Sequence, residues 1–178
     1  MVRITFPDGS TRDYEAAVTG LDIATSISPR LRKEALSITV DGDIWDLTRL
    51  IDHNASVKIN TWDDPEGKHA YWHSSAHLMA EAIEDLFPGV KFGIGPSIEN
   101  GFYYDIDFGD YKVTEEDLAR IEERMRFFAK KNEPICRSEI SKTEAKETFQ
   151  KKGDPYKLEL IDGLEDGTIS FYTQGNFT

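Results

Sequence analysis

A break at Trp62-Asp63-Asp64-Pro65-Glu66-Gly67 divides the sequence into two stretches with different patterns. The break holds a proline, a glycine and three acidic residues, a composition typical of a connection between folded units. Short alternating segments precede the break, and a long helical pattern follows it. A chain of 178 residues can form either one domain or two, and the change of pattern at the break indicates two domains. We therefore predict one domain over residues 1–61 and a second over residues 62–178.

The first stretch has the pattern of a small mixed α/β unit. Strands are expected where apolar residues alternate, and hairpins where Pro7–Ser10 or Asp41-Gly42 supplies a turn. Helical spacing of Ile23, Ala24 and Ile27 predicts one helix, limited by Pro29. This order of elements predicts a ubiquitin-like β-grasp fold. The expected segments are strands at Val2–Phe6, Thr11–Glu15, Ala35–Val40, Ile44–Trp45 and Ser56–Asn60, with the helix at Asp22–Ile27.

The second stretch predicts an α+β domain with an antiparallel sheet and long helices. A long helix is expected from about Lys68 to Phe87, before Pro88-Gly89. Thr114 resembles the cap of a further helix that ends near Lys131, with an apolar stripe at Leu118, Ile121, Met125 and Phe128. A short helix is expected at Lys142–Lys152. Strand-like segments are Gly93–Gly95, Gly101–Ile106, Ile135–Ile140, Leu158–Ile161 and Ser170–Tyr172.

Charge and composition exclude several classes of protein. The net charge is −12, with 7 Lys/Arg and 9 Asp/Glu in residues 1–61 against 14 and 24 in residues 62–178. A stand-alone nucleic-acid binder needs a basic surface, so any contact with nucleic acid must use local patches. No apolar run reaches the ~20 residues of a membrane span, and the N-terminus lacks a secretory pattern. The single cysteine, Cys136, fits a reducing compartment, so we expect a cytoplasmic protein without membrane contact.

Three of the four histidines, His69, His73 and His77, recur at intervals of four residues on the long predicted helix. At ~100° per residue they fall within ~80° of one another, away from the main apolar stripe. Three interpretations remain open: a solvated face, a zinc site, or a cleft wall where neutral imidazoles orient water. The zinc interpretation is the weakest on sequence, because zinc needs three or four ligands and no partner motif is evident.

Longer motifs carry a resemblance to a known family. His73–Ala80, Gly93-Ile94-Gly95-Pro96, Glu99–Asp105 and Gly153–Lys157 closely resemble the threonyl-tRNA synthetase family, in this order along the whole chain. The resemblance implies that residues 1–61 form a TGS domain. It implies that residues 62–178 form most of a domain that hydrolyses seryl-tRNA(Thr), a product of mischarging.

The resemblance also implies roles for individual residues. His73 and His77 would orient water or the terminal ribose, and His69 would only flank the site. Tyr104 would bond the ribose or the seryl group, and Lys157 would hold a phosphate or help to activate water. Gly93 and Gly95 would allow close approach of the ligand. The catalytic residues implied are therefore His73, His77, Lys157 and Tyr104, and the substrate-binding residues are Gly93, Gly95 and Tyr104, without metal.

In the family, the ligase domain that uses ATP, Mg and zinc follows this region. We therefore expect no cofactor here, the acceptor end of tRNA(Thr) as partner, and a monomer in place of the homodimer of the whole enzyme. The family's editing site also uses an Asp and a Cys-x-x-x-His element that do not follow Phe177-Thr178, so little activity is expected from this chain alone. Two alternatives are a TGS-based binding or regulatory module and a zinc-dependent deacylase.

Overall fold

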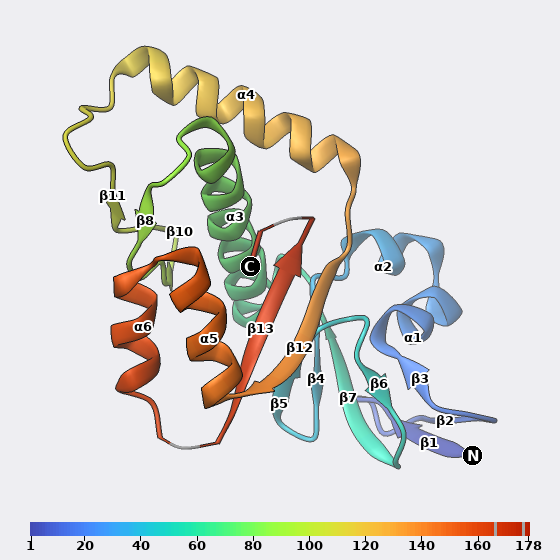
Figure 1. The fold of residues 1–178 in the computed structure, drawn as a ribbon. Helices are drawn as coiled ribbons and strands as arrows, with labels where there is room; N and C mark the ends of the chain where they lie inside the picture. Colours follow the sequence, from blue (N-terminus) through green and yellow to red (C-terminus); the bar gives the residue numbers. More distant parts are fainter. Residues whose placement is uncertain (166, 176) are drawn as a thin grey trace. The chain divides into compact units, whose positions relative to one another are not determined.

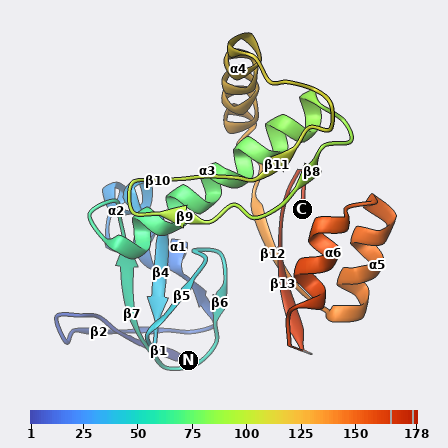
Figure 2. The same cartoon turned by 90° about the vertical axis from the view of Figure 1, so that its left-hand side faces the viewer.

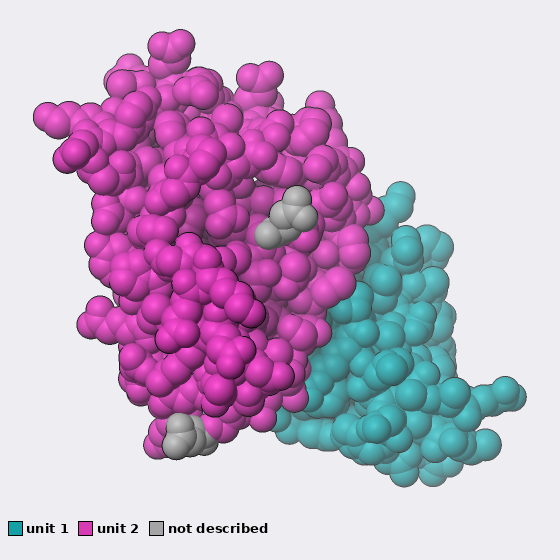
Figure 3. All heavy atoms as spheres, viewed as in Figure 1, with its two compact units in different colours: residues 1–72, 98–100 teal, residues 73–97, 101–178 magenta. Residues whose placement is uncertain are grey.

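The computed structural model describes residues 1–165, 167–175 and 177–178. They form two compact units, residues 1–72 with 98–100 and residues 73–97 with 101–178 (Figure 3). Helix α3, Pro65–Leu86, contributes residues to both units. The boundary between residues 61 and 62 stays a prediction. No helix among the described residues combines the length and the apolar character needed to span a membrane.

The first unit is built on a five-stranded mixed sheet with the order β2-β1-β7-β4-β5 (Figure 1). Strands β1 and β7 are parallel, and the neighbouring pairs are antiparallel. A second, two-stranded pairing joins β3 to β6. The predicted β-grasp fold is confirmed. The strands are β1 Val2–Thr5, β2 Thr11–Tyr14, β3 Val18–Thr19, β4 Ser37–Val40, β5 Asp43–Trp45, β6 Leu50–Ile51 and β7 Ala55–Asn60.

Two capped helices complete the first unit. Helix α1, Gly20–Ile27, begins with a capping box in which Thr19 and Asp22 satisfy each other's backbone N–H groups. Pro29 does not simply limit this helix, as expected, but opens a further helix, α2, at Pro29–Glu34. Proline fits that first position because its missing N–H would have no partner there. The core lies between sheet and helix, with Ile4, Ile23, Ile38 and Ile51 fully buried.

The start of α3 requires a glycine. A Cβ on Gly67 would lie 2.0 Å from the carbonyl oxygen of Thr61, so any larger residue would displace the backbone that follows β7. The helix begins three residues before the predicted Lys68, because Pro65 is tolerated in a first turn.

The second unit combines helices with short antiparallel pairings (Figure 2). Strands β12 and β13 pair along their whole length, and helices α5 and α6 pack on them through Phe149, Ile161 and Phe171. A separate core joins α3 and α4 to β8 and β11 through Ile83, Phe92 and Ile121. The elements are β8 Lys91–Phe92, β9 Ser97–Ile98, β10 Gly101–Phe102, β11 Ile106–Asp107, α4 Glu115–Lys131, β12 Ile135–Ser141, α5 Lys142–Lys152, α6 Pro155–Asp162 and β13 Thr168–Gln174.

Three expectations for the second unit were wrong. The segment Leu158–Ile161 is not a strand but belongs to α6, because Asp154 caps a helix that opens with Pro155. Gly93–Gly95 lies between β8 and β9 and belongs to neither strand, although Gly93 and Ile94 bond to the backbone of Asp105. Leu118 is 59% exposed, because the apolar face of α4 meets its neighbours only from Ile121 onward.

Candidate functional site

His73 and His77 occupy successive turns of α3, above the fully buried Ala76 and Ala80. Their ring centroids are 4.9 Å apart, and the ring planes make an angle of 35°. His73 is exposed at the surface, while His77 is half-buried. His69 is exposed and is not among the residues that line the cavity described next. The helix therefore presents two imidazoles together rather than three.

Both histidines line a cavity of 430 Å³ within the second unit. Tyr104 and Lys157 line the same cavity, so the structure brings together all four residues predicted as catalytic. Most of the remaining wall is aromatic or aliphatic, as is usual for a pocket that binds a small molecule. The other lining residues are Glu84, Phe92, Phe149, Lys152, Asp154, Leu160, Ile161, Leu164, Ser170, Phe171, Tyr172, Phe177 and Thr178.

Burial keeps the imidazole of His77 neutral. It lowers the pKa of His77 to about 4, and the charges of His73 and Lys157 act in the same direction. The ring packs edge-on against Phe177, at 5.8 Å between centroids, and Phe177 in turn packs against Phe92. A neutral imidazole has one nitrogen that accepts a proton and one that donates. His77 is thus unprotonated at neutral pH and able to accept a hydrogen bond, although so low a pKa makes it a weak base.

Lys157 is placed in the first turn of α6, where its backbone N–H donates to the capping Asp154 at 3.2 Å. Its ammonium group donates to the carbonyl oxygen of Gly93 at 2.9 Å and to the hydroxyl of Tyr104 at 3.4 Å. Burial lowers the pKa of Lys157, and the carboxylate of Asp154 opposes that effect. The lysine therefore joins the loop at Gly93 to the tyrosine ring.

Tyr104 stays protonated throughout the physiological range. Burial, and to a smaller extent the negative charge of Asp154, raise the pKa of Tyr104 to about 12. Its ring packs against Phe92 at 5.6 Å between centroids. With Lys157 it forms a pair of hydrogen-bond donors in the same cavity as the two imidazoles.

The two glycines predicted to admit a ligand shape the wall of the site. Neither Gly93 nor Gly95 lines the cavity itself. A Cβ on Gly95 would lie 2.4 Å from Cδ2 and 2.6 Å from Cε2 of Tyr104, so the glycine leaves room for that ring. A Cβ on Gly93 would lie 3.1 Å from the Cβ of Asp105. Their role in binding substrate stays a prediction.

Replacing Gly95 with alanine is expected to displace the Tyr104 ring and to destabilise the second unit by about 1–3 kcal/mol, the usual cost of overpacking. Urea unfolding followed by far-UV circular dichroism measures the loss. Gly167→Ala is the control, because nothing lies within 4 Å of a Cβ there. Equal stability of the two variants would show that the ring moves aside at no cost.

Two parts of the site were not identified from the sequence alone. Asp154 is only 7% exposed and both caps α6 and faces Tyr104 and Lys157. The sequence did indicate the capping role of Asp154, since an Asp directly before a Pro is typical of the start of a helix. Phe177 was interpreted only as the end of a strand, and no local pattern indicated that its ring would reach His77.

The chain contains side chains that can bind a metal ion, but the described part of the structure does not bring three of them together. Among the residues that the structure describes, no group of three or more His, Cys, Asp and Glu side chains is placed to hold an ion. The zinc-dependent alternative stays a prediction that metal analysis can test.

Comparison with known proteins defines the class of the chain first. Residues 2–61 match the model of the TGS domain, the family expected for the first 61 residues. The whole chain matches one group of aminoacyl-tRNA synthetases.

These relatives are threonine–tRNA ligases. The chain is 58% identical over 179 residues to the threonine–tRNA ligase of Porphyromonas gingivalis. This match covers all of the present chain and 27% of the Porphyromonas protein. It is 55% identical to the ligase of Parabacteroides distasonis, again with 27% of that protein covered, and 52% identical to that of Cytophaga hutchinsonii, with 28% covered. The chain thus spans just over a quarter of the length of the curated relatives it matches. The resemblance to the threonyl-tRNA synthetase family is confirmed, as a likeness to its N-terminal region.

Proposed function

We propose that this chain is the N-terminal region of a threonine–tRNA ligase and that its second unit supplies most of the site that hydrolyses seryl-tRNA(Thr). The observation that carries the proposal is the convergence of His73, His77, Tyr104 and Lys157 on one cavity of 430 Å³. The longer protein would join threonine to tRNA(Thr) with ATP and Mg in a further, zinc-containing domain, as a cytoplasmic homodimer. This region would then remove serine attached in error.

Hydrolysis of the ester needs a base for the attacking water. The water oxygen bonds to the ester carbonyl carbon while a neutral imidazole accepts its proton. The bond from that carbon to the ribose oxygen then breaks, and the ribose oxygen takes up a proton, which leaves serine and tRNA. His77 is unprotonated at neutral pH, because its pKa is about 4, so its ring nitrogen can accept a hydrogen bond from the water and orient it. His73, with its ring 4.9 Å away, would orient the same water or the terminal ribose.

The reaction also needs donors for the negative charge that develops on the carbonyl oxygen. Lys157 and Tyr104 are already joined by a hydrogen bond, and Tyr104 keeps its proton near neutral pH. The contact of Lys157 with the Gly93 carbonyl holds the ammonium group in place before a substrate arrives. Such preorganised donors stabilise the transition state without further rearrangement.

Editing is required because serine differs from threonine by one methyl group. A methyl group in a binding pocket discriminates by only about 1–3 kcal/mol, which is too little for accurate translation. A second cavity that admits the serine ester and rejects the threonine ester supplies the rest. The bulky walls at Phe92, Phe149 and Phe177 suit a role in exclusion by size.

Contact with tRNA must be local, because the chain carries a net charge of −12. Lys152 lines the cavity, and its ammonium group lies 6.0 Å from the ring centroid of Phe177. A phosphate next to the terminal ribose can pair with this lysine without a wider basic surface.

The test compares hydrolysis of seryl-tRNA(Thr) and threonyl-tRNA(Thr) by the full-length ligase, with and without His73→Ala. We expect rapid release of serine, retention of threonine, and loss of serine release in the variant. The matched control is His69→Ala, which removes an imidazole from the same helix outside the cavity. Equal rates on both esters, or full activity of His73→Ala, would contradict the proposal. A chelator in the same assay separates it from the zinc-dependent alternative, since activity is expected to survive.

A further inference from the structure

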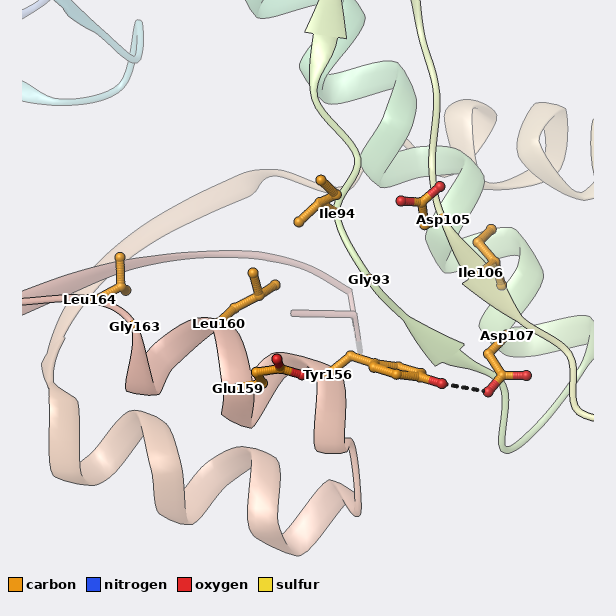
Figure 4. Close-up of a pocket in the computed structure, with 10 residues that line it drawn as sticks. All are labelled: Gly93, Ile94, Asp105, Ile106, Asp107, Tyr156, Glu159, Leu160, Gly163 and Leu164. Carbon is orange, nitrogen blue, oxygen red and sulfur yellow. Dashed lines mark hydrogen bonds between the residues drawn. The ribbon is translucent and has the colours of Figure 1, made fainter.

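A second, larger hollow of 860 Å³ lies within the second unit (Figure 4). Its floor is apolar and open to solvent. Ile94 is 46% exposed, Leu160 42% and Leu164 49%. We call this hollow the acidic groove; it is lined by Gly93, Ile94, Asp105, Ile106, Asp107, Tyr156, Glu159, Leu160, Gly163 and Leu164.

The charges that line the acidic groove have one sign. They are the carboxylates of Asp105, Asp107 and Glu159, and no Lys, Arg or His is among the lining residues. Asp107 is fixed in place, because its Oδ2 accepts a hydrogen bond from the Tyr156 hydroxyl at 2.9 Å and its Oδ1 accepts one from the N–H of Gly109 at 2.8 Å. The two bonds hold the pKa of Asp107 below its usual range, so this carboxyl group is ionised.

The walls of the groove are held by backbone bonds rather than by side chains alone. The backbone N–H of Gly93 donates to the carbonyl oxygen of Asp105 at 2.8 Å. The backbone N–H of Asp105 donates to the carbonyl oxygen of Ile94 at 2.9 Å. The opposite wall is helix α6, whose first turn is capped by Asp154; its carboxylate accepts a hydrogen bond from the N–H of Lys157. In Figure 4, Tyr156 reaches from α6 across to Asp107 on β11. A surface held in this way can bind a partner without first being ordered.

We infer that the acidic groove docks a protein segment that presents an apolar side chain flanked by lysines or arginines. Charge selects this occupant: the carboxylates repel RNA phosphates, and a second copy of the chain would bring another net charge of −12. The apolar floor requires an apolar anchor, since a few anchors that fill small pockets carry most of the binding energy of an interface. The groove shares Leu160 and Leu164 with the cavity but does not contain His73, His77, Tyr104 or Lys157. The inference therefore goes beyond the proposed hydrolysis.

Three synthetic helical peptides serve as probes in an NMR titration of the ¹⁵N-labelled chain. The first carries leucines on one face and lysines beside them. The second has the same leucines with glutamates, and the third has the same lysines with serines in place of the leucines. We expect saturable shifts at Ile94, Ile106 and Glu159 with the first peptide only, and weaker binding as salt is added.

Matched variants separate a specific groove from general attraction to an acidic protein. Ile94→Ser is expected to weaken binding about tenfold through loss of the apolar floor, while Leu118→Ser, which alters an exposed leucine on α4, leaves it unchanged. Asp105→Asn with Glu159→Gln is likewise expected to weaken binding, and Glu123→Gln with Glu147→Gln is the control of equal charge. All replaced side chains except Ile94 and Leu118 are acidic and exposed, and dispersed amide spectra verify folding. Shifts spread over the whole surface, or equal weakening by the test and control variants, would overturn the inference.

Discussion

Replacing Lys157 with methionine is expected to slow hydrolysis of seryl-tRNA(Thr) by about 10²–10³-fold, the usual effect of losing one preorganised donor. Methionine keeps the apolar stem that packs in the cavity and removes the ammonium group that bonds Gly93 and Tyr104. The measurement is the single-turnover rate of serine release by the full-length ligase.

Lys151→Met is the matched control for this prediction. Lys151 is an exposed residue in the last turn of α5, does not line the cavity, and loses the same charge on substitution. If Lys157 only held a phosphate, KM would rise while kcat stayed unchanged, so the two parameters distinguish its roles. An unchanged kcat in Lys157→Met would rule out a part in stabilising the transition state.

A second large effect is expected from acid, through His77. The pKa of His77 is about 4 in the folded chain against an ordinary value of 6.5. Between pH 6.5 and pH 4 the unfolded chain therefore binds a proton that the folded chain does not. As the pH is lowered through this range, the free energy of unfolding decreases. Because His77 is not completely buried, we expect a loss of about 2–3 kcal/mol over this window.

The comparison with His77→Gln isolates this contribution, because glutamine does not titrate while carboxylates elsewhere titrate in both proteins. Urea unfolding at pH 7.0, 5.5 and 4.0, followed by circular dichroism, gives the stability of each. The three tryptophans, Trp45, Trp62 and Trp72, all belong to the first unit, so their fluorescence is an internal control. The first unit also holds His53, and Asp52 and Asp41 raise the pKa of His53. Acid therefore changes the stability of the first unit through His53 in the direction opposite to its effect through His77. Parallel pH curves for the two proteins would contradict the prediction.

Local signals in the sequence were sufficient where an element is short and bounded by turn or cap residues. The hairpin β1–β2, the helix α5 and the start of α4 at Thr114 all follow from such signals. The same reasoning was wrong at Leu158–Ile161, because the short run Leu-Glu-Leu-Ile fits a strand and a helix turn equally well. The deciding residues, Asp154 and Pro155, lie just before the run.

The site was predictable in its residue types but not in its geometry. The family motifs contain His73, His77, Tyr104 and Lys157, and the structure brings these four to one cavity. Spacing along the chain carries no information on the bond from Lys157 to Gly93, which joins residues 64 positions apart. The ring contact of Phe177 and the acidic groove likewise depend on tertiary packing. These features required the three-dimensional structure.

The same long-range bond has a consequence for synthesis on the ribosome. The walls of the cavity come from α3, from Phe92 and Tyr104, from α5 and α6, and from Phe177, which are translated in that order. The β-grasp sheet closes with β7 at Asn60 and can form while the rest is still being made. The cavity exists only after Phe177 has left the exit tunnel, because contacts far apart in sequence form last. A nascent chain therefore carries a folded first unit before it carries any hydrolytic site.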